Sequence, residues 1–247
     1  MFIHYRAQGF VLEKVDQGEA DQLFTIFTKK AGKLKILARA IRKPKSKLRT
    51  FIPIFSICKI EFIQGKHYKT LTDSVVISDF ENIKKSLVKL KTAYKITEAF
   101  NQLVKSPEKD EKIWQLLNEV FNHLNNYFLL STHYPLIYYF FLWNLLSILG
   151  YKPELYKCLN CNQKLTPSNL YFSRQGGIIC ENCYKKAEGL SKKKMPKDLK
   201  IDENTIKILR EIFKKDLKSF LKIKIKKEYF NSLKEISDFY ISQFQNG

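Results

Sequence analysis

Four of the five cysteines in this 247-residue sequence form two pairs that could bind a metal ion. Cys158 and Cys161 enclose the dipeptide LN, and Cys180 and Cys183 enclose EN, with 18 residues between the pairs. A gap of two residues lets both thiolates of a pair reach one ion, so this arrangement is typical of tetrahedral zinc. Since four thiolates leave no open coordination position, the sequence predicts one structural Zn²⁺ ion and no catalytic metal.

Redox-active C-x-x-C pairs are the alternative, but no thioredoxin-like βαβ pattern surrounds these cysteines. Asn162 follows the first pair where a left-handed residue would close the turn, and asparagine tolerates that conformation. Strand-like residues around Gly176 and Gly177 indicate the hairpin of a zinc ribbon. Cys58, within the strand-like FSICKIEF, is expected to be an inert core thiol.

A second group of residues offers positive charge. Residues 33–49 read KLKILARAIRKPKSKLR, with no acid, in a chain whose 44 lysines and arginines against 24 acids give a net charge of +20. Such an excess attracts polyanions, so nucleic acid or an anionic membrane is the expected partner. Alternation predicts a strand with one cationic face, followed by a cationic loop that Pro44 stiffens. We expect nucleic-acid contact from Lys33, Lys35, Arg39, Arg42, Lys43, Lys45, Lys47 and Arg49.

The alternative for this stretch is a solvated face in a protein that is rich in lysine throughout. Aromatic side chains in residues 1–80 could provide the stacking surfaces that single-strand binders use. The second basic region, 185–227, could either extend a nucleic-acid path or coat helices.

The elements that must position these residues fall into two parts. Short β-branched and aromatic runs at 10–15, 22–29, 33–41, 54–63 and 68–77 predict five strands, which fit an OB-like barrel, with a two-hairpin sandwich as the rival. From residue 81 helical periodicity takes over, at 81–105, 113–124, 134–149, 206–213 and 229–240. We predict an α+β multidomain protein: a barrel domain at 1–80, then a helical domain at 81–247 with an inserted four-cysteine zinc ribbon at about 156–186.

The apolar run YPLIYYFFLWNLLSILG, residues 134–150, is shorter than the ~20 residues of a membrane span. Pro135 suits the first turn of a helix and Gly150 its C-terminal stop, so we predict a buried core helix; a membrane span is the less favoured alternative. The first residues show no secretory signal pattern, and we expect a cytoplasmic protein.

Residues for catalysis are sparse. The sequence has no ATP-binding glycine loop and no close acidic cluster for two metal ions, which predicts a protein that is not an enzyme. Glu19 and Asp21 are expected to form a turn that hydrogen-bonds its own backbone. The histidines are scattered and are expected to be structural or on the surface: His4, His67, His123 and His133.

The ordered set of motifs resembles the RecO family of bacterial DNA repair proteins. GFVLEKVDQGEADQLFTIFTKKAGK with LARAIRKPKS resembles the family's start, and CLNC with FSRQGGIICENC resembles its zinc segment. The resemblance extends over essentially the whole chain, and it carries Arg39, Arg42, Lys43, Lys45 and Ser46 onto the family's barrel loop. Ala40 and Asn162 stand where the family usually, or often, has glycine.

The resemblance implies a recombination mediator in the cytoplasm, at the bacterial nucleoid. Such proteins bind single- and double-stranded DNA, anneal complementary strands, and work with RecR to load RecA onto DNA coated by single-strand DNA-binding protein. The resemblance and the basic segment 214–227 also suggest that the helical domain accepts the acidic tail of that coating protein. The competing functions are a zinc-ribbon nucleic-acid enzyme and an RNA-binding accessory factor.

Overall fold

The computed structural model describes residues 3–44, 46, 52–65, 67–105, 107–126, 133–166, 169–190 and 198–244. The chain divides into two compact units, Met1–Tyr134 and Pro135–Gly247. The first compact unit therefore contains the barrel together with the helices that follow it. The domain boundary predicted after residue 80 stays a prediction.

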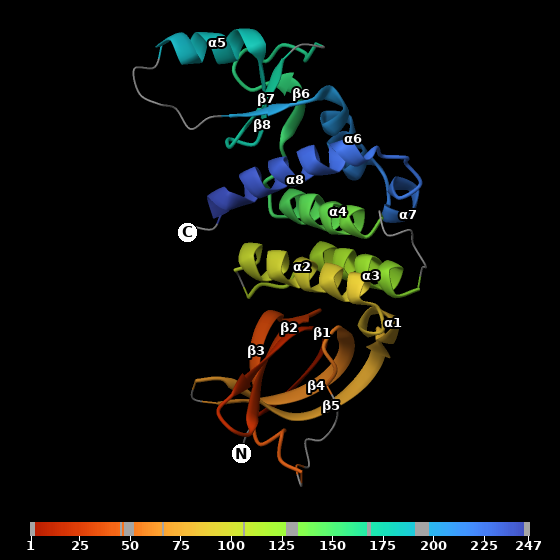
Figure 1. Cartoon of the computed structure of the whole chain (residues 1–247). Helices are drawn as coiled ribbons and strands as arrows, with labels where there is room; N and C mark the ends of the chain where they lie inside the picture. The colour runs from red at the N-terminus through yellow and green to blue at the C-terminus, as the bar shows by residue number, and fades with distance from the viewer. Residues whose placement is uncertain are drawn as a thin grey trace. The chain divides into compact units, whose positions relative to one another are not determined.

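A closed five-stranded barrel makes up most of the first unit (Figure 1). Its strands are β1 (His4–Gln17), β2 (Asp21–Thr28), β3 (Gly32–Ala38), β4 (Ser56–Gln64) and β5 (Lys69–Asp79). The order β1-β2-β3-β5-β4 closes on β1, and only β3 and β5 pair in parallel. This confirms the predicted OB-like barrel and excludes the two-hairpin sandwich.

The long strand β1 closes the barrel because its two halves have different partners. Residues 4–11 pair with β4, and residues 9–17 pair with β2. A register shift between Val11 and Glu13 marks a bulge, which bends β1 from one neighbour to the other.

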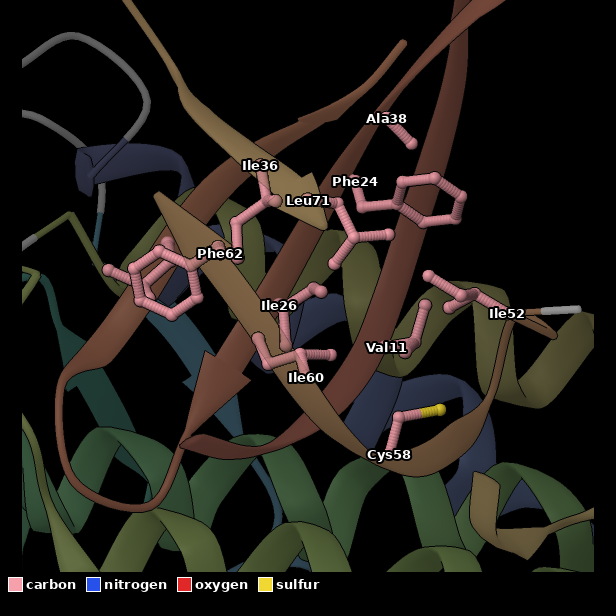
Figure 2. Close-up of a cluster of buried hydrophobic side chains, with 11 residues drawn as sticks. Val11, Phe24, Ile26, Ile36, Ala38, Ile52, Cys58, Ile60, Phe62 and Leu71 are labelled. Atoms are coloured by element: carbon pink, nitrogen blue, oxygen red, sulfur yellow. The ribbon is translucent and has the colours of Figure 1, made fainter. Parts of the chain in front are cut away.

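The barrel interior is filled by alternating apolar side chains of the strands, as Figure 2 shows. Cys58 is fully buried among them, as predicted. Burial raises the pKa of its thiol, which keeps the sulfur protonated and unreactive. The cluster consists of Val11, Phe24, Ile26, Leu34, Ile36, Ala38, Ile52, Cys58, Ile60, Phe62 and Leu71.

Three helices cover one side of the barrel within the first unit. They are α1 (Glu81–Lys84), α2 (Leu87–Leu103) and α3 (Glu111–Asn126). Buried phenylalanine rings join them to the strands: the Phe27 and Phe100 rings lie 5.2 Å apart, and the Phe10 and Phe121 rings 4.7 Å apart. The single helix predicted at 81–105 is wrong, because Ser86 has an extended backbone that separates α1 from α2.

The strand predicted at 33–41 also ends early, and the reason lies in the basic loop. Ala40 has a left-handed backbone with φ of 53°, which no regular strand accommodates. Its N–H donates a 2.7 Å hydrogen bond to the Asp21 carboxylate, and the N–H of Arg42 donates to the carbonyl oxygen of Ala20. The β1–β2 hairpin therefore holds the chain where it leaves β3.

The second unit contains a buried helix and a small sheet. Helix α4 (His133–Ile148) is followed by β6 (Glu154–Cys158), β7 (Leu170–Ser173), β8 (Gly177–Cys180), α5 (Glu181–Leu190) and β9 (Leu199–Ile201). Three further helices, α6 (Glu203–Lys214), α7 (Leu217–Phe220) and α8 (Lys227–Ile241), precede a final 3₁₀ turn, Ser242–Phe244. The sheet order is β6-β8-β7-β9, and β9 is a short strand that the sequence pattern did not predict.

Helix α4 is the core helix predicted from its composition. Trp143 is fully buried, its indole N–H donates to the Ser237 hydroxyl at 3.1 Å, and its ring stacks on Tyr240 at 5.5 Å. Gly150, with φ of 89°, follows the helix as the predicted C-terminal stop. In the described part of the chain, no helix is both long and apolar enough to cross a membrane.

Replacing Ala40 with glycine should stabilise the protein, because a Cβ atom is penalised in the left-handed region. We expect Ala40→Gly to raise the free energy of unfolding by about 0.5–1 kcal/mol, after subtracting the entropy that glycine adds to the unfolded chain. Denaturant titration measures the change. The control is Ala31→Gly at an exposed turn residue outside the left-handed region, which should lower stability instead. Loss of stability in both variants would contradict this role of Ala40.

Candidate metal centre and nucleic-acid interface

The four paired cysteines converge on one point in the second unit and form a four-cysteine cluster. Their Sγ atoms all lie within 4.8 Å of one another, and the Cys161 and Cys180 sulfurs are 3.9 Å apart. A tetrahedral ion with Zn–S bonds of about 2.3 Å would separate its sulfurs by roughly 3.8 Å. The cluster therefore has the size of a tetrahedral thiolate site, and it could hold a metal ion.

Turns at the ends of strands present these thiols. Cys158 ends β6, Cys180 ends β8 directly before α5, and Cys183 lies in the first turn of that helix. The N–H of Asn162 donates to the carbonyl oxygen of Cys158 at 2.9 Å, and the φ of Asn162 is 57°. This confirms the left-handed closing residue that was predicted after the first pair. The predicted hairpin is confirmed as well, since β7 and β8 pair around Gly176.

The thiols of the cluster have very different proton affinities. Burial alone would raise the pKa of Cys158, but hydrogen bonds from the backbone N–H groups of Cys161, Cys180 and Asn160 outweigh it and lower that pKa to about 6. Burial and the neighbouring sulfurs raise the pKa of Cys183. Adjacent thiolates repel one another, so full ionisation of the cluster requires a cation among them.

The basic stretch lies in the first unit, and its members have different surroundings. Lys33 is half-buried, and its ammonium donates to the carbonyl oxygens of Asn101 and Val104, at 3.2 and 2.9 Å, where α2 ends. Burial, and then the charge of Lys35, lower the pKa of Lys33. Lys33 therefore neutralises the negative end of a helix, and its contact with nucleic acid stays a prediction.

Three of the predicted contacts remain open to a ligand. Lys35, Arg39 and Lys43 are exposed, and none of them forms an ion pair with another described residue. Arg42 is exposed too, but its guanidinium lies 3.3 Å from the Asp16 carboxylate. Ser46 is half-buried. Lys45, Lys47 and Arg49 lie outside the described residues.

The sequence did not predict that two acidic residues of the β1–β2 hairpin contact the basic loop after β3. Asp16 pairs with Arg42, and Asp21 accepts the N–H of Ala40. The expectation that Asp21 bonds its own turn is wrong, because its carboxylate reaches a residue 19 positions away. The stretch 33–49 contains no acid, yet folding brings carboxylates to it from the preceding hairpin.

The second basic region shows several neutralised lysines. Lys207 and Lys215 each form an ion pair with a glutamate one helical turn earlier, at 2.8 and 3.3 Å. Lys185 and Lys226 have glutamate partners as well. Such pairs are common on solvated helices, and residues 191–197 lie outside the described part of the chain. Within that part, the four-cysteine cluster is the one group of three or more histidine, cysteine or acidic side chains close enough to hold a metal ion.

Comparison with known proteins covers nearly the whole chain. The family model Recombination protein O N terminal matches residues 1–80, and Recombination protein O C terminal matches residues 85–244. The DNA repair protein RecO of Dehalococcoides mccartyi is 31% identical over 230 residues, which are 93% of this chain and 86% of the relative. That of Halalkalibacterium halodurans is 25% identical over 97% of this chain and 89% of its own length.

A third relative, the DNA repair protein RecO of Acetivibrio thermocellus, is 26% identical over 97% of this chain and 91% of its own length. The two family models fall on the barrel and on the part that carries the four-cysteine cluster, in the order in which the sequence motifs occur. On this evidence the chain belongs to the RecO family of DNA repair and recombination proteins.

Proposed function

We propose that this chain is a non-enzymatic recombination mediator that binds single- and double-stranded DNA and anneals complementary strands. The observation that carries the proposal is the exposed set Lys35, Arg39 and Lys43 on one barrel, without acidic partners among the described residues. Lysine and arginine bind phosphates by displacing condensed counterions, a mechanism that does not depend on sequence. Because the chain belongs to a DNA repair family, we expect the bound polyanion to be DNA.

Annealing requires that two phosphate backbones approach each other, and it requires no covalent chemistry. A chain with a net charge of +20 can neutralise both strands and raise their local concentration. The binding energy comes from counterion release, so neither ATP nor a catalytic residue is needed. The barrel therefore supplies a surface for pairing, and the base pairs themselves supply the specificity.

We assign one structural zinc ion to the four-cysteine cluster. The sulfur spacing fits tetrahedral Zn²⁺, and an all-thiolate set leaves no position for a substrate or a reactive water. Bound zinc would join the end of β6 to the β7–β8 hairpin and the first turn of α5. Its contribution is to the stability of the second unit.

The proposed partners follow from the family. The chain would act with RecR in the cytoplasm, at the nucleoid, to place RecA on DNA coated by single-strand DNA-binding protein. Lysines of residues 214–227 support binding of that protein's acidic tail by the second unit, since Lys218, Lys222 and Lys224 have no ion-pair partner among the described residues.

Reversing charge on the barrel should impair strand annealing. We expect Lys35→Glu combined with Arg39→Glu to slow the annealing of complementary oligonucleotides by roughly 10-fold or more at low salt, because phosphates would meet like charges. The assay follows the fluorescence of labelled strands without added nucleotide.

The matched control reverses Lys91 and Lys112, which are exposed on α2 and α3 of the same unit. It changes the net charge by the same amount, and annealing should stay within about twofold of the wild type. Equal loss in both variants would show that only total charge matters. Failure of the wild-type protein to accelerate annealing would remove the proposed function.

Removing a cysteine of the cluster should release the ion and destabilise the second unit. Elemental analysis should find one zinc per wild-type chain and little in Cys161→Ser. The melting temperature of this unit should fall by about 10 °C or more, since structural zinc contributes directly to folding.

The control for zinc binding is Cys58→Ala, which removes a buried thiol of the barrel core. This variant should lose some stability through the cavity it creates, yet it should retain the full zinc content. DNA affinity of Cys161→Ser should change little below its melting temperature, because the proposed phosphate contacts Lys35, Arg39 and Lys43 lie in the first unit. A metal-free wild-type chain of normal stability would contradict the zinc assignment.

A further inference from the structure

A cavity of about 460 Å³ opens on the outer wall of the barrel where β3 and β5 meet. These strands share only two pairs, Ile36 with Lys69 and Leu37 with Thr70, before their chains separate. The cavity lies at this junction and is lined by Leu37, Arg39, His67, Tyr68 and Thr70. Its volume is in the range of small-molecule sites and is ample for a nucleobase.

The turn between β4 and β5 fixes the position of Tyr68 at this cavity. The N–H of Gly65 donates to the carbonyl oxygen of Tyr68 at 3.1 Å, which closes the turn. Any Cβ atom at position 65 would lie 2.4 Å from that oxygen, so the tight turn requires glycine. In OB folds the loop between the fourth and fifth strands borders the ligand face. Here that loop carries an aromatic residue at the mouth of a cavity.

The side chains that line the cavity are those that a nucleotide needs. Tyr68 is 37% exposed, and an accessible aromatic ring can stack on a base of any sequence. Leu37 provides an apolar floor that is almost fully buried. Arg39 is exposed and has no partner among the described residues, so its planar guanidinium can bind a phosphate through two hydrogen bonds.

Charge and shape together select an unpaired nucleotide as the occupant. Lys35 and Arg39 bring positive charge to this end of β3, which favours a phosphate-bearing ligand over an uncharged aromatic compound. Bases inside a duplex are paired and stacked on their neighbours, so entering a cavity costs roughly a few kcal/mol of unpairing and unstacking energy. A base of a single strand can turn outward and enter at small cost.

We propose that this cavity is a subsite for one unpaired nucleobase of single-stranded DNA, with Tyr68 stacking on the base and Arg39 binding its phosphate. The inference rests on the proposed function, DNA binding by the barrel, and adds to it the contact that distinguishes a single strand from a duplex. In annealing, such a contact would hold a strand until pairing withdraws its base from the cavity.

The test compares Tyr68→Ala with Tyr68→Phe, which keeps the ring and removes the hydroxyl. Affinities of the full chain are measured by fluorescence anisotropy for three ligands: a single-stranded oligonucleotide, the same strand with abasic sites throughout, and a duplex. Loss of stacking should weaken single-strand binding of Tyr68→Ala by about 5- to 100-fold. Tyr68→Phe should stay within about threefold of the wild type, and duplex binding should stay within about twofold for both variants.

The abasic strand provides the decisive comparison. Wild-type protein should bind it more weakly than the normal strand, whereas Tyr68→Ala should bind both nearly alike. The control variant is Tyr94→Ala, which removes an exposed tyrosine on α2 of the same unit and should leave all three affinities unchanged.

The outcomes separate this subsite from DNA binding in general. Unchanged single-strand affinity in Tyr68→Ala, or an equal loss on abasic strand and duplex, would overturn the subsite while wild-type binding stands. Absence of wild-type binding to any of the ligands would instead overturn the proposed function, and the subsite with it. Circular dichroism and melting curves show whether each variant is folded.

Discussion

The hydrogen bond from the Ala40 N–H to the Asp21 carboxylate, 2.7 Å long, is the contact on which the cationic face of the barrel depends. The chain leaves β3 at this point, and Ala40 must adopt a left-handed backbone to do so. A charged acceptor makes a strong hydrogen bond, which offsets the conformational cost at Ala40. The Arg42 N–H and guanidinium reinforce the contact through Ala20 and Asp16. The direction of Arg39 and Lys43 is therefore set by the hairpin between β1 and β2.

The positive charge of the first unit is divided between structural and exposed roles. Lys33 and Lys89 donate to carbonyl oxygens near the ends of α2 and α3, and burial lowers the pKa of each. These lysines stabilise helix ends. The exposed cations face water instead, where neutralisation by phosphate is favourable. The four-cysteine cluster lies in the other compact unit and has no part in this division.

The features that could be predicted from the sequence depend on residues that are close together in the chain. Alternation and turn residues gave the five strands, ligand spacing gave the four-cysteine cluster, and the tolerance of asparagine for positive φ gave the turn at Asn162. Contacts between distant residues could not be predicted in this way. In the sequence, Lys33 cannot be distinguished from other strand lysines. Its role depends on the Val104 carbonyl oxygen at the end of α2, which is 71 positions away in the chain. The cavity beside Tyr68 likewise exists only because β3 and β5 share two pairs and then diverge.

Direct binding of phosphates by Lys35, Arg39 and Lys43, as proposed above, is tested most directly by the salt dependence of DNA affinity. The logarithm of affinity for a single strand falls with the logarithm of salt concentration by about 0.7 for each phosphate neutralised. Replacing these three cations by alanine should therefore make the slope shallower by about 2, whereas alanine at Lys85, Lys91 and Lys112 should leave it unchanged. An identical slope in wild type and the barrel variant, with the fold intact, would show that DNA does not bind at this face.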